Sequence, residues 1–168
     1  IRRCDDALEA YQRALHITEY NLGSENSKVA TLLNNIADTY RIMDNYEKAL
    51  EFYQRALNIA RSCLGKEHPM VALIMNNMGK LYIDTHEWEK SHSVCQQAFD
   101  IRKKNLGTDH VDFAISSLDL GIIYGCLGRR DHALPLSEHS LYIFEQKLGS
   151  DHRYTKQAKL VVDTLKGI

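Results

Sequence analysis

Eight histidines and four cysteines are the side chains of this 168-residue sequence best suited to hold a metal ion or to act as nucleophiles. His68, His110 and His152 follow one another at intervals of 42 residues, and each stands where a helix is expected to begin. This recurrence predicts a structural role at the helix start. The remaining histidines lack the four-residue spacing that places two imidazoles on one helix face, and H-E-x-x-H is absent. We therefore expect no metal and no cofactor.

The four cysteines include no C-x-x-C pair, which is typical of reduced thiols in a cytosolic protein. Cys95 and Cys126 stand at positions where a small apolar residue suits a helical core. The neighbouring sequence supplies no activating base, and it contains neither a P-loop nor a G-x-G-x-x-G motif. The sequence predicts a cytoplasmic protein that is not an enzyme.

Two asparagine pairs, Asn34-Asn35 and Asn76-Asn77, are 42 residues apart. Asparagine is a poor helix former because its side chain competes with the backbone for hydrogen bonds. Its amide both donates and accepts, which suits gripping the main chain of an extended peptide without reading its sequence. The alternative is that these amides bridge adjacent helices and bind nothing. Both interpretations are open at this point.

The overall composition excludes several classes of partner. The chain carries 21 basic and 22 acidic residues, for a formal net charge of −1, so no strong field favours nucleic acid or a membrane surface. The longest apolar stretch is far too short to cross a bilayer. Charged residues make up 26% and apolar ones 44%, which is ordinary for a folded globular protein. We expect a protein or peptide partner.

The elements that position these residues come from an internal repeat. Leu-Gly recurs at intervals of exactly 42 residues, ending at Gly23, Gly65, Gly107 and Gly149. Within each unit, apolar residues recur at steps of three and four, as over residues 45–63, which predicts amphipathic helices. Glycine ends one helix, and an acidic residue followed by histidine precedes the next. No segment alternates as a strand does, so the fold class is all-α, with about eight helices.

Small residues recur in register within these helices, and they predict close approach between paired helices. They form the sets Ala37, Gly79 and Gly121, and Ala49, Ser91 and Ala133. A helix hairpin of this kind cannot bury its apolar faces alone, so neighbouring hairpins are expected to stack as a solenoid.

Taken together, these features resemble the tetratricopeptide repeat. The small residue, the tyrosine three positions later, and the alanine–aromatic–alanine pattern of the partner helix carry the resemblance. The 42-residue period, the connector with Glu67-His68-Pro69, and the run around Asn34-Asn35 resemble the kinesin light chain type. The resemblance implies a right-handed α-solenoid of antiparallel helix pairs. It also implies that the first helix of each pair lines a concave groove, with Asn35, Asn77 and Asp119 contacting the backbone of a ligand.

By the same register, the remaining groove residues are Asn34, Asp38, Arg41, Leu73, Asn76, Lys80, Ile115, Leu118 and Ile122. The apolar members would hold an aliphatic or aromatic anchor of the ligand, or else they contact the last helix, after Arg153. Asp38 and Asp84 nearly offset the positive charge of Arg41 and Lys80. The lysine-and-asparagine clamp of chaperone-binding relatives is not reproduced, so we expect no binding of chaperone tails.

The predicted organisation is one array over residues 1–168. It consists of a half-repeat, three full repeats and a terminal half-repeat, over residues 5–22, 27–64, 69–106, 111–148 and 152–166. Leu8, Tyr11 and Leu15 call for a preceding helix. We expect either a fragment of a longer array or half-repeats that pair with another copy.

The function expected from the sequence is protein–protein interaction, through a partner segment held in the concave groove. The alternative is a structural spacer or oligomerisation element that stacks through its half-repeats. On the first interpretation, Asn35→Ala with Asn77→Ala abolishes partner capture and leaves the melting temperature unchanged. On the second, a charge at Leu8 or Tyr11 abolishes self-association.

Overall fold

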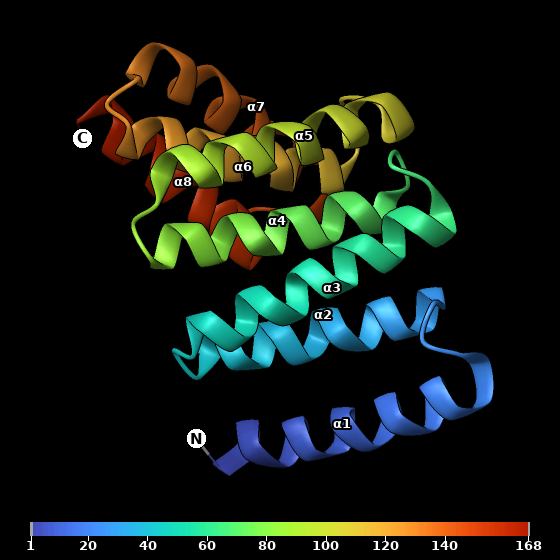
Figure 1. Cartoon of the computed structure of the whole chain (residues 1–168). Coiled ribbons are helices and arrows are strands. Elements are labelled where there is room, and N and C mark those ends of the chain that lie inside the picture. The colour runs from blue at the N-terminus through green and yellow to red at the C-terminus, as the bar shows by residue number, and fades with distance from the viewer. Residues whose placement is uncertain (1, 168) are drawn as a thin grey trace. The chain divides into compact units, whose positions relative to one another are not determined.

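The computed structural model describes residues 2–167, and this stretch contains eight α-helices and no strand (Figure 1). The predicted all-α class is therefore confirmed. The helices are α1 (Arg2–Leu22), α2 (Ser27–Ile42), α3 (Tyr46–Leu64), α4 (Pro69–Asp84), α5 (Trp88–Leu106), α6 (Val111–Cys126), α7 (Arg130–Leu148) and α8 (Arg153–Lys166). The Leu-Gly motif ends the second helix of a pair, as predicted. At Gly65 the backbone has a φ of 88°, a value that favours glycine, and its N–H bonds to the Arg61 carbonyl.

The chain forms two compact units, residues 1–85 and 86–168. In the first unit, α1 packs on α2, α2 on α3 and α3 on α4, and α2 also touches α4. In the second unit, α5 packs on α6, α6 on α7 and α7 on α8, and α6 also touches α8. The same kind of helix, the first of each pair, therefore lies beside its counterpart within each unit.

The core of the first unit lies mainly between α2 and α3. Leu33 and Ile36 of α2 and Tyr53 of α3 are fully buried. The Tyr40 ring stacks on Phe52, with ring centroids 5.5 Å apart, and Lys48 Nζ lies 5.2 Å from the centroid of the Tyr40 ring. The recurring tyrosine thus fills the space between paired helices.

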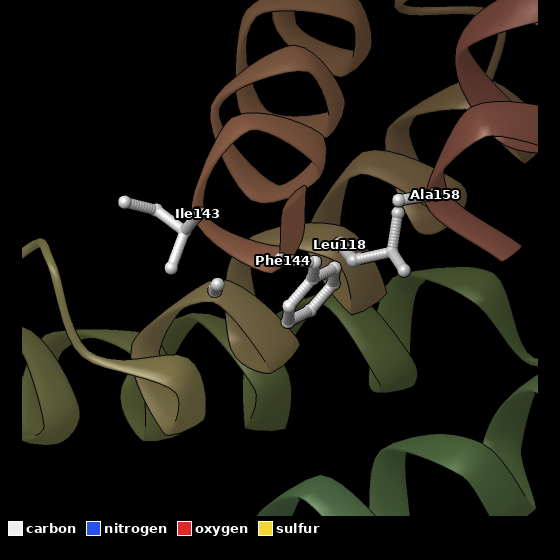
Figure 2. Packing of buried hydrophobic residues seen from close by; sticks show 5 residues of the cluster. Leu118, Ile143, Phe144 and Ala158 are labelled. Carbon is white, nitrogen blue, oxygen red and sulfur yellow. The ribbon is translucent and has the colours of Figure 1, made fainter. Parts of the chain in front are cut away.

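The core of the second unit joins α6, α7 and α8 (Figure 2). Its buried cluster consists of Ala114, Leu118, Ile143, Phe144 and Ala158. The ring of Phe144 is fully buried and stacks on Tyr154 of α8 with a centroid separation of 5.5 Å. The last helix is therefore tied to the unit through apolar contacts with α6 and α7.

Cys95 and Cys126 were both predicted to lie in the core, but the structure buries only the first of them. Cys95 of α5 is buried, with 1% of its surface exposed. Cys126 is exposed, so its predicted core position is wrong. It is the last residue of α6.

The three periodic histidines cap helices, as predicted. His68, His110 and His152 are the N-cap residues of α4, α6 and α8. In each case imidazole Nδ1 accepts a hydrogen bond from the backbone N–H two residues later, over 3.1–3.2 Å. Each ring thereby satisfies one of the backbone donors that a helix leaves free in its first turn.

His152→Ala is expected to lower the free energy of unfolding of the second unit by about 1 kcal/mol, because the first turn of α8 loses its side-chain acceptor. His152→Asn restores an acceptor and should retain most of the stability. Hydrogen exchange of the α8 amides, with urea unfolding of both variants, measures the difference. Equal losses in the alanine and asparagine variants would contradict the capping role.

Candidate functional site

The asparagine pairs of α2 and α4 are joined by a chain of side-chain hydrogen bonds. Asn77 Nδ2 donates to Asn34 Oδ1 over 3.1 Å, and Asn34 Nδ2 donates to Asn35 Oδ1 over 3.4 Å. Asn34 and Asn76 are buried, with 6% and 2% of their surfaces exposed. This corrects the prediction for the first asparagine of each pair. At Asn34 the amide bridges adjacent helices, and neither buried side chain is open to a ligand.

The second asparagine of each pair is only half-buried. Asn35 accepts from Asn34 through Oδ1, and Asn77 donates to Asn34 through Nδ2. Within residues 2–167 this leaves the Nδ2 group of Asn35 and the Oδ1 atom of Asn77 without a hydrogen-bond partner. One donor and one acceptor are what a peptide main chain requires.

Arg41 is held between two carboxylates. Its Nε donates to Asp38 Oδ1 over 3.1 Å, and its Nη1 donates to Asp84 Oδ2 of α4 over 2.7 Å. The buried Tyr53 hydroxyl donates to the same Asp38 atom over 3.2 Å. Two members of the predicted groove set, Asp38 and Arg41, thus belong to an internal network that ties α2 to α3 and α4.

The pKa values in this network follow from its contacts. Burial lowers the pKa of Arg41, but the hydrogen bond to Asp84 and the nearby Asp38 carboxylate raise it by more, so its net shift is upward. Burial, followed by the Asp38 charge, raises the pKa of Tyr53, which keeps the hydroxyl protonated as a donor. Asp38 and Asp84, which were expected to offset the positive charge of Arg41, both form ion pairs with it.

Two further predicted residues of the first unit are accessible. Lys80 is half-buried and forms no ion pair within residues 2–167. Leu73 exposes 45% of its surface. The first unit therefore presents two amide groups, a cation and an apolar side chain.

The predicted residues of α6 divide into buried and accessible ones. Leu118 is 2% exposed and packs in the cluster of Phe144 and Ala158, so its predicted place in an open groove is wrong (Figure 2). Its contact with the last helix follows the alternative interpretation. Ile115 is half-buried against the same cluster. Ile122 remains accessible in a surface pocket.

Asp119, predicted as a ligand contact, is also nearly buried, with 9% of its surface exposed. It lies close enough to the buried Arg102 of α5 to interact with its charge. Burial lowers the pKa of Arg102, and the Asp112 and Asp119 carboxylates oppose that shift. Arg102 donates to the Asp112 carbonyl over 3.2 Å and to the Ser116 hydroxyl. Asp119 is therefore part of the electrostatic support of a buried arginine.

A pocket of about 350 Å³ lies between α6 and α8. It is lined by Gly121, Ile122, Gly125, Cys126, Leu160, Val161, Thr164 and Leu165. None of these side chains carries a charge, and burial raises the pKa of the Cys126 thiol, which favours its neutral form. The α8 residues were missed from the sequence, because the last helix was considered only as an alternative contact of the apolar groove residues. The pocket is therefore lined by uncharged side chains.

The sequence profile of the tetratricopeptide repeat matches residues 1–62, 28–104 and 70–146. The chain belongs to the tetratricopeptide repeat family. Members of this family generally mediate protein–protein interactions and generally lack catalytic activity. This membership supports a role in protein–protein interaction.

Solved tetratricopeptide structures show the same fold. BtubC (BKLC) from P. vanneervenii is 28% identical, with a TM-score of 0.78 over 88% of this chain and 59% of that one. A putative kinesin light chain from Podosopora anserina with nearly identical TPR-like repeats is 20% identical, with a TM-score of 0.76 over 98% of this chain and 79% of that one. The predicted likeness to repeats of the kinesin light chain type is confirmed at the level of the fold.

A third tetratricopeptide-like structure is that of the apo form of RapI, which is 19% identical, with a TM-score of 0.79 over 99% of this chain. The chain spans 44% of RapI and about three fifths of BtubC. No curated protein matches the chain. In the part of the chain between residues 2 and 167, no helix is long and apolar enough to cross a membrane. Among the same residues, no three His, Cys, Asp or Glu side chains are grouped so that they could hold a metal ion.

Proposed function

We propose that this tetratricopeptide chain binds a peptide segment of a partner protein on the faces formed by its first helices. The observation that carries the proposal is the uncharged pocket of about 350 Å³ between α6 and α8. Concave apolar pockets with a few polar groups are the usual binding sites of proteins, and binding energy concentrates on anchors that fill them. The anchor is an aliphatic or aromatic side chain of the partner.

The half-buried amides of α2 and α4 support the proposal from the first unit. Asn35 Nδ2 donates to a carbonyl of the ligand, and Asn77 Oδ1 accepts from a ligand N–H. Such contacts hold a main chain whatever its sequence. Lys80 adds a cation beside the amides.

The alternative, stacking of copies through their half-repeats, is disfavoured by the charges of α8. Four positions of α2 are buried apolar residues, namely Ala30, Leu33, Ala37 and Tyr40. The corresponding positions of α8 are charged, namely Lys156, Lys159, Asp163 and Lys166. Placing charges in such a contact would cost several kcal/mol in desolvation.

The test is a selection of random peptides on the purified chain, followed by affinity measurement with Leu160→Asp. Leu160 lines the pocket and exposes 68% of its surface, so the substitution should leave the fold intact. Tyr142→Asp, with 59% exposure on α7 and no place in the pocket, is the matched control. We expect selected peptides to share an apolar residue and to bind Leu160→Asp at least tenfold more weakly. Equal affinity for the two variants would exclude the pocket.

The amide contacts need a different substitution from the paired alanine variant. Because Asn77 bonds to the buried Asn34, Asn77→Ala leaves that carbonyl unpaired and lowers stability by about 1–3 kcal/mol. The expectation of an unchanged melting temperature is therefore revised. Asn35→Asp keeps the acceptor for Asn34 and replaces the Nδ2 donor with a negatively charged acceptor. We expect it to weaken binding of the selected peptides severalfold with an unchanged melting temperature.

A further inference from the structure

A second pocket, of about 340 Å³, lies between the second helices α5 and α7, and both of these helices pack on α6. The residues that line it are Gln96, Phe99, Leu120, Tyr124, Asp131, His132, Pro135 and Leu136. Leu120 of α6 is buried, whereas Asp131 and His132 of α7 are exposed. None of these residues lines the α6–α8 pocket, so the two pockets are separate sites.

The first unit shows which side chains occupy the corresponding place there, because α1, α2 and α3 match α5, α6 and α7 at an interval of 84 residues. The corresponding pairs are Tyr40 and Tyr124, Lys48 and His132, and Phe52 and Leu136. In the first unit, Lys48 Nζ lies 5.2 Å from the centroid of the Tyr40 ring, and Phe52 stacks on the same ring. A cation at this distance is attracted by the negative face of the ring. The first unit therefore supplies a cation to this tyrosine from its own chain.

Tyr124 keeps the aromatic ring in the second unit, but its neighbours differ. His132 takes the place of the lysine, and its ring centroid lies 5.3 Å from that of Tyr124. His92 Nε2 lies 2.9 Å from the Tyr124 hydroxyl, and this hydrogen bond fixes the orientation of the tyrosine. Leu136 replaces the stacked phenylalanine and is half-buried. The pocket thus lies beside an oriented tyrosine, where the first unit places a phenylalanine and an ammonium group.

Two oxygen acceptors accompany the aromatic rings of the pocket. The Asp131 carboxylate forms no hydrogen bond or ion pair within residues 2–167. Pro135, in the interior of α7, has no N–H, so the Asp131 carbonyl four residues earlier lacks its usual helical donor. Among the lining residues, which all belong to the described part of the chain, there is neither lysine nor arginine. The nearby Arg129 lies 3.6 Å from the Glu89 carboxylate, and Arg130 does not line the pocket.

Arginine is the side chain that matches this combination of rings and acceptors. Its planar guanidinium stacks on aromatic rings, carries five N–H donors and pairs with a carboxylate through two parallel bonds. Lysine offers a compact, strongly hydrated charge that makes fewer of these contacts. Phe99, Tyr124 and His132 supply the rings, and Asp131 supplies the acceptors.

We propose that the pocket between α5 and α7 binds an arginine side chain of a partner protein. The guanidinium lies against the Tyr124 ring, in the place that Lys48 takes beside Tyr40, and it donates to the Asp131 carboxylate and carbonyl. The proposal stands whether or not the α6–α8 pocket holds an apolar anchor, because the two pockets share no residue.

The probe is N-acetyl-arginine N-methylamide, titrated into the isotope-labelled full chain and followed by the NMR shifts of the backbone amides. One stacked and ion-paired side chain gives a dissociation constant on the order of 10 mM. We expect saturable shifts in the first turns of α7 and around Phe99 of α5. The citrulline analogue, which has the same shape without the charge, should give no saturable shifts over the same range. The lysine analogue should bind severalfold more weakly than the arginine analogue.

Variants of α7 locate the probe on the chain. His132→Lys gives the second unit the lysine of the first, which would occupy the site, so binding should fall at least tenfold. Tyr142→Lys adds a lysine to the same helix outside the pocket, at a position with 59% exposure, and it should leave binding unchanged. Asp131→Asn, at an exposed position, removes the negative charge and should weaken binding severalfold.

The absence of saturable shifts with the arginine analogue would overturn the proposal, as would equal binding of the citrulline analogue. Equal binding to the His132→Lys and Tyr142→Lys chains would place the probe outside the pocket and overturn it as well. Binding of the lysine analogue as tight as that of the arginine analogue would overturn the assignment to arginine.

Discussion

Phe144→Ala is expected to lower the free energy of unfolding of the second unit by about 3–5 kcal/mol. The ring is fully buried among α6, α7 and α8, and it stacks on Tyr154. Its removal leaves a cavity, and α8 also loses an aromatic contact. Hydrogen exchange of the second unit and the urea midpoint at constant slope measure the loss.

Tyr142→Ala is the matched control, because it removes an aromatic side chain from the same helix at 59% exposure. It should change stability by no more than about 0.5 kcal/mol. A loss below 1 kcal/mol for Phe144→Ala would mean that the cluster in Figure 2 does not hold the unit together.

Gly121→Ala is expected to destabilise the second unit by about 2 kcal/mol, although alanine is the better helix former by about 1 kcal/mol. A Cβ atom at this position would lie 2.3 Å from Ser137 Oγ and 3.2 Å from the Ala133 carbonyl oxygen. The Ser137 hydroxyl is itself buried and bonded to that carbonyl. The close approach predicted from the recurring small residues is present at this point.

A double variant separates this steric effect from a general effect of the substitution. Ser137→Ala removes the nearest atom, so Gly121→Ala with Ser137→Ala should recover most of the loss in urea unfolding. Gly125→Ala on the same helix meets only a leucine methyl, that of Leu165 at 3.3 Å, and it should leave stability unchanged or raise it. A stable Gly121→Ala variant, or a double variant no better than the single one, would contradict the close packing.

The helices, their ends and the structural histidines could be predicted because each depends on local chemistry repeated at a known period. Gly65 ends a helix through its own backbone conformation, and His152 caps one through a bond to an N–H two residues away. The close approach at Gly121 follows from residue size in register. None of these features requires knowledge of how the units are arranged.

The candidate site was predicted less well, because it depends on contacts between equivalent helices. Periodicity places Asn34, Asn76 and Leu118 on the face of a first helix, but it does not separate the open centre of that face from its edge. The structure buries Asn34 under a bond from Asn77, and it buries Leu118 under α8. Leu160 occupies the same position of the repeat as Asn34 and Leu118, but its side chain is exposed.

Leu160 and Val161 occupy the register of the asparagine pair on the same type of helix. The same two positions of a first helix can therefore carry either polar or apolar side chains without a change of the backbone. Exchanging these two residues would change the side chains that a hairpin presents and leave the recurring tyrosines and alanines of its interior untouched. Duplication of the hairpin, followed by substitution at these two positions, is accordingly a short evolutionary path to a new binding specificity.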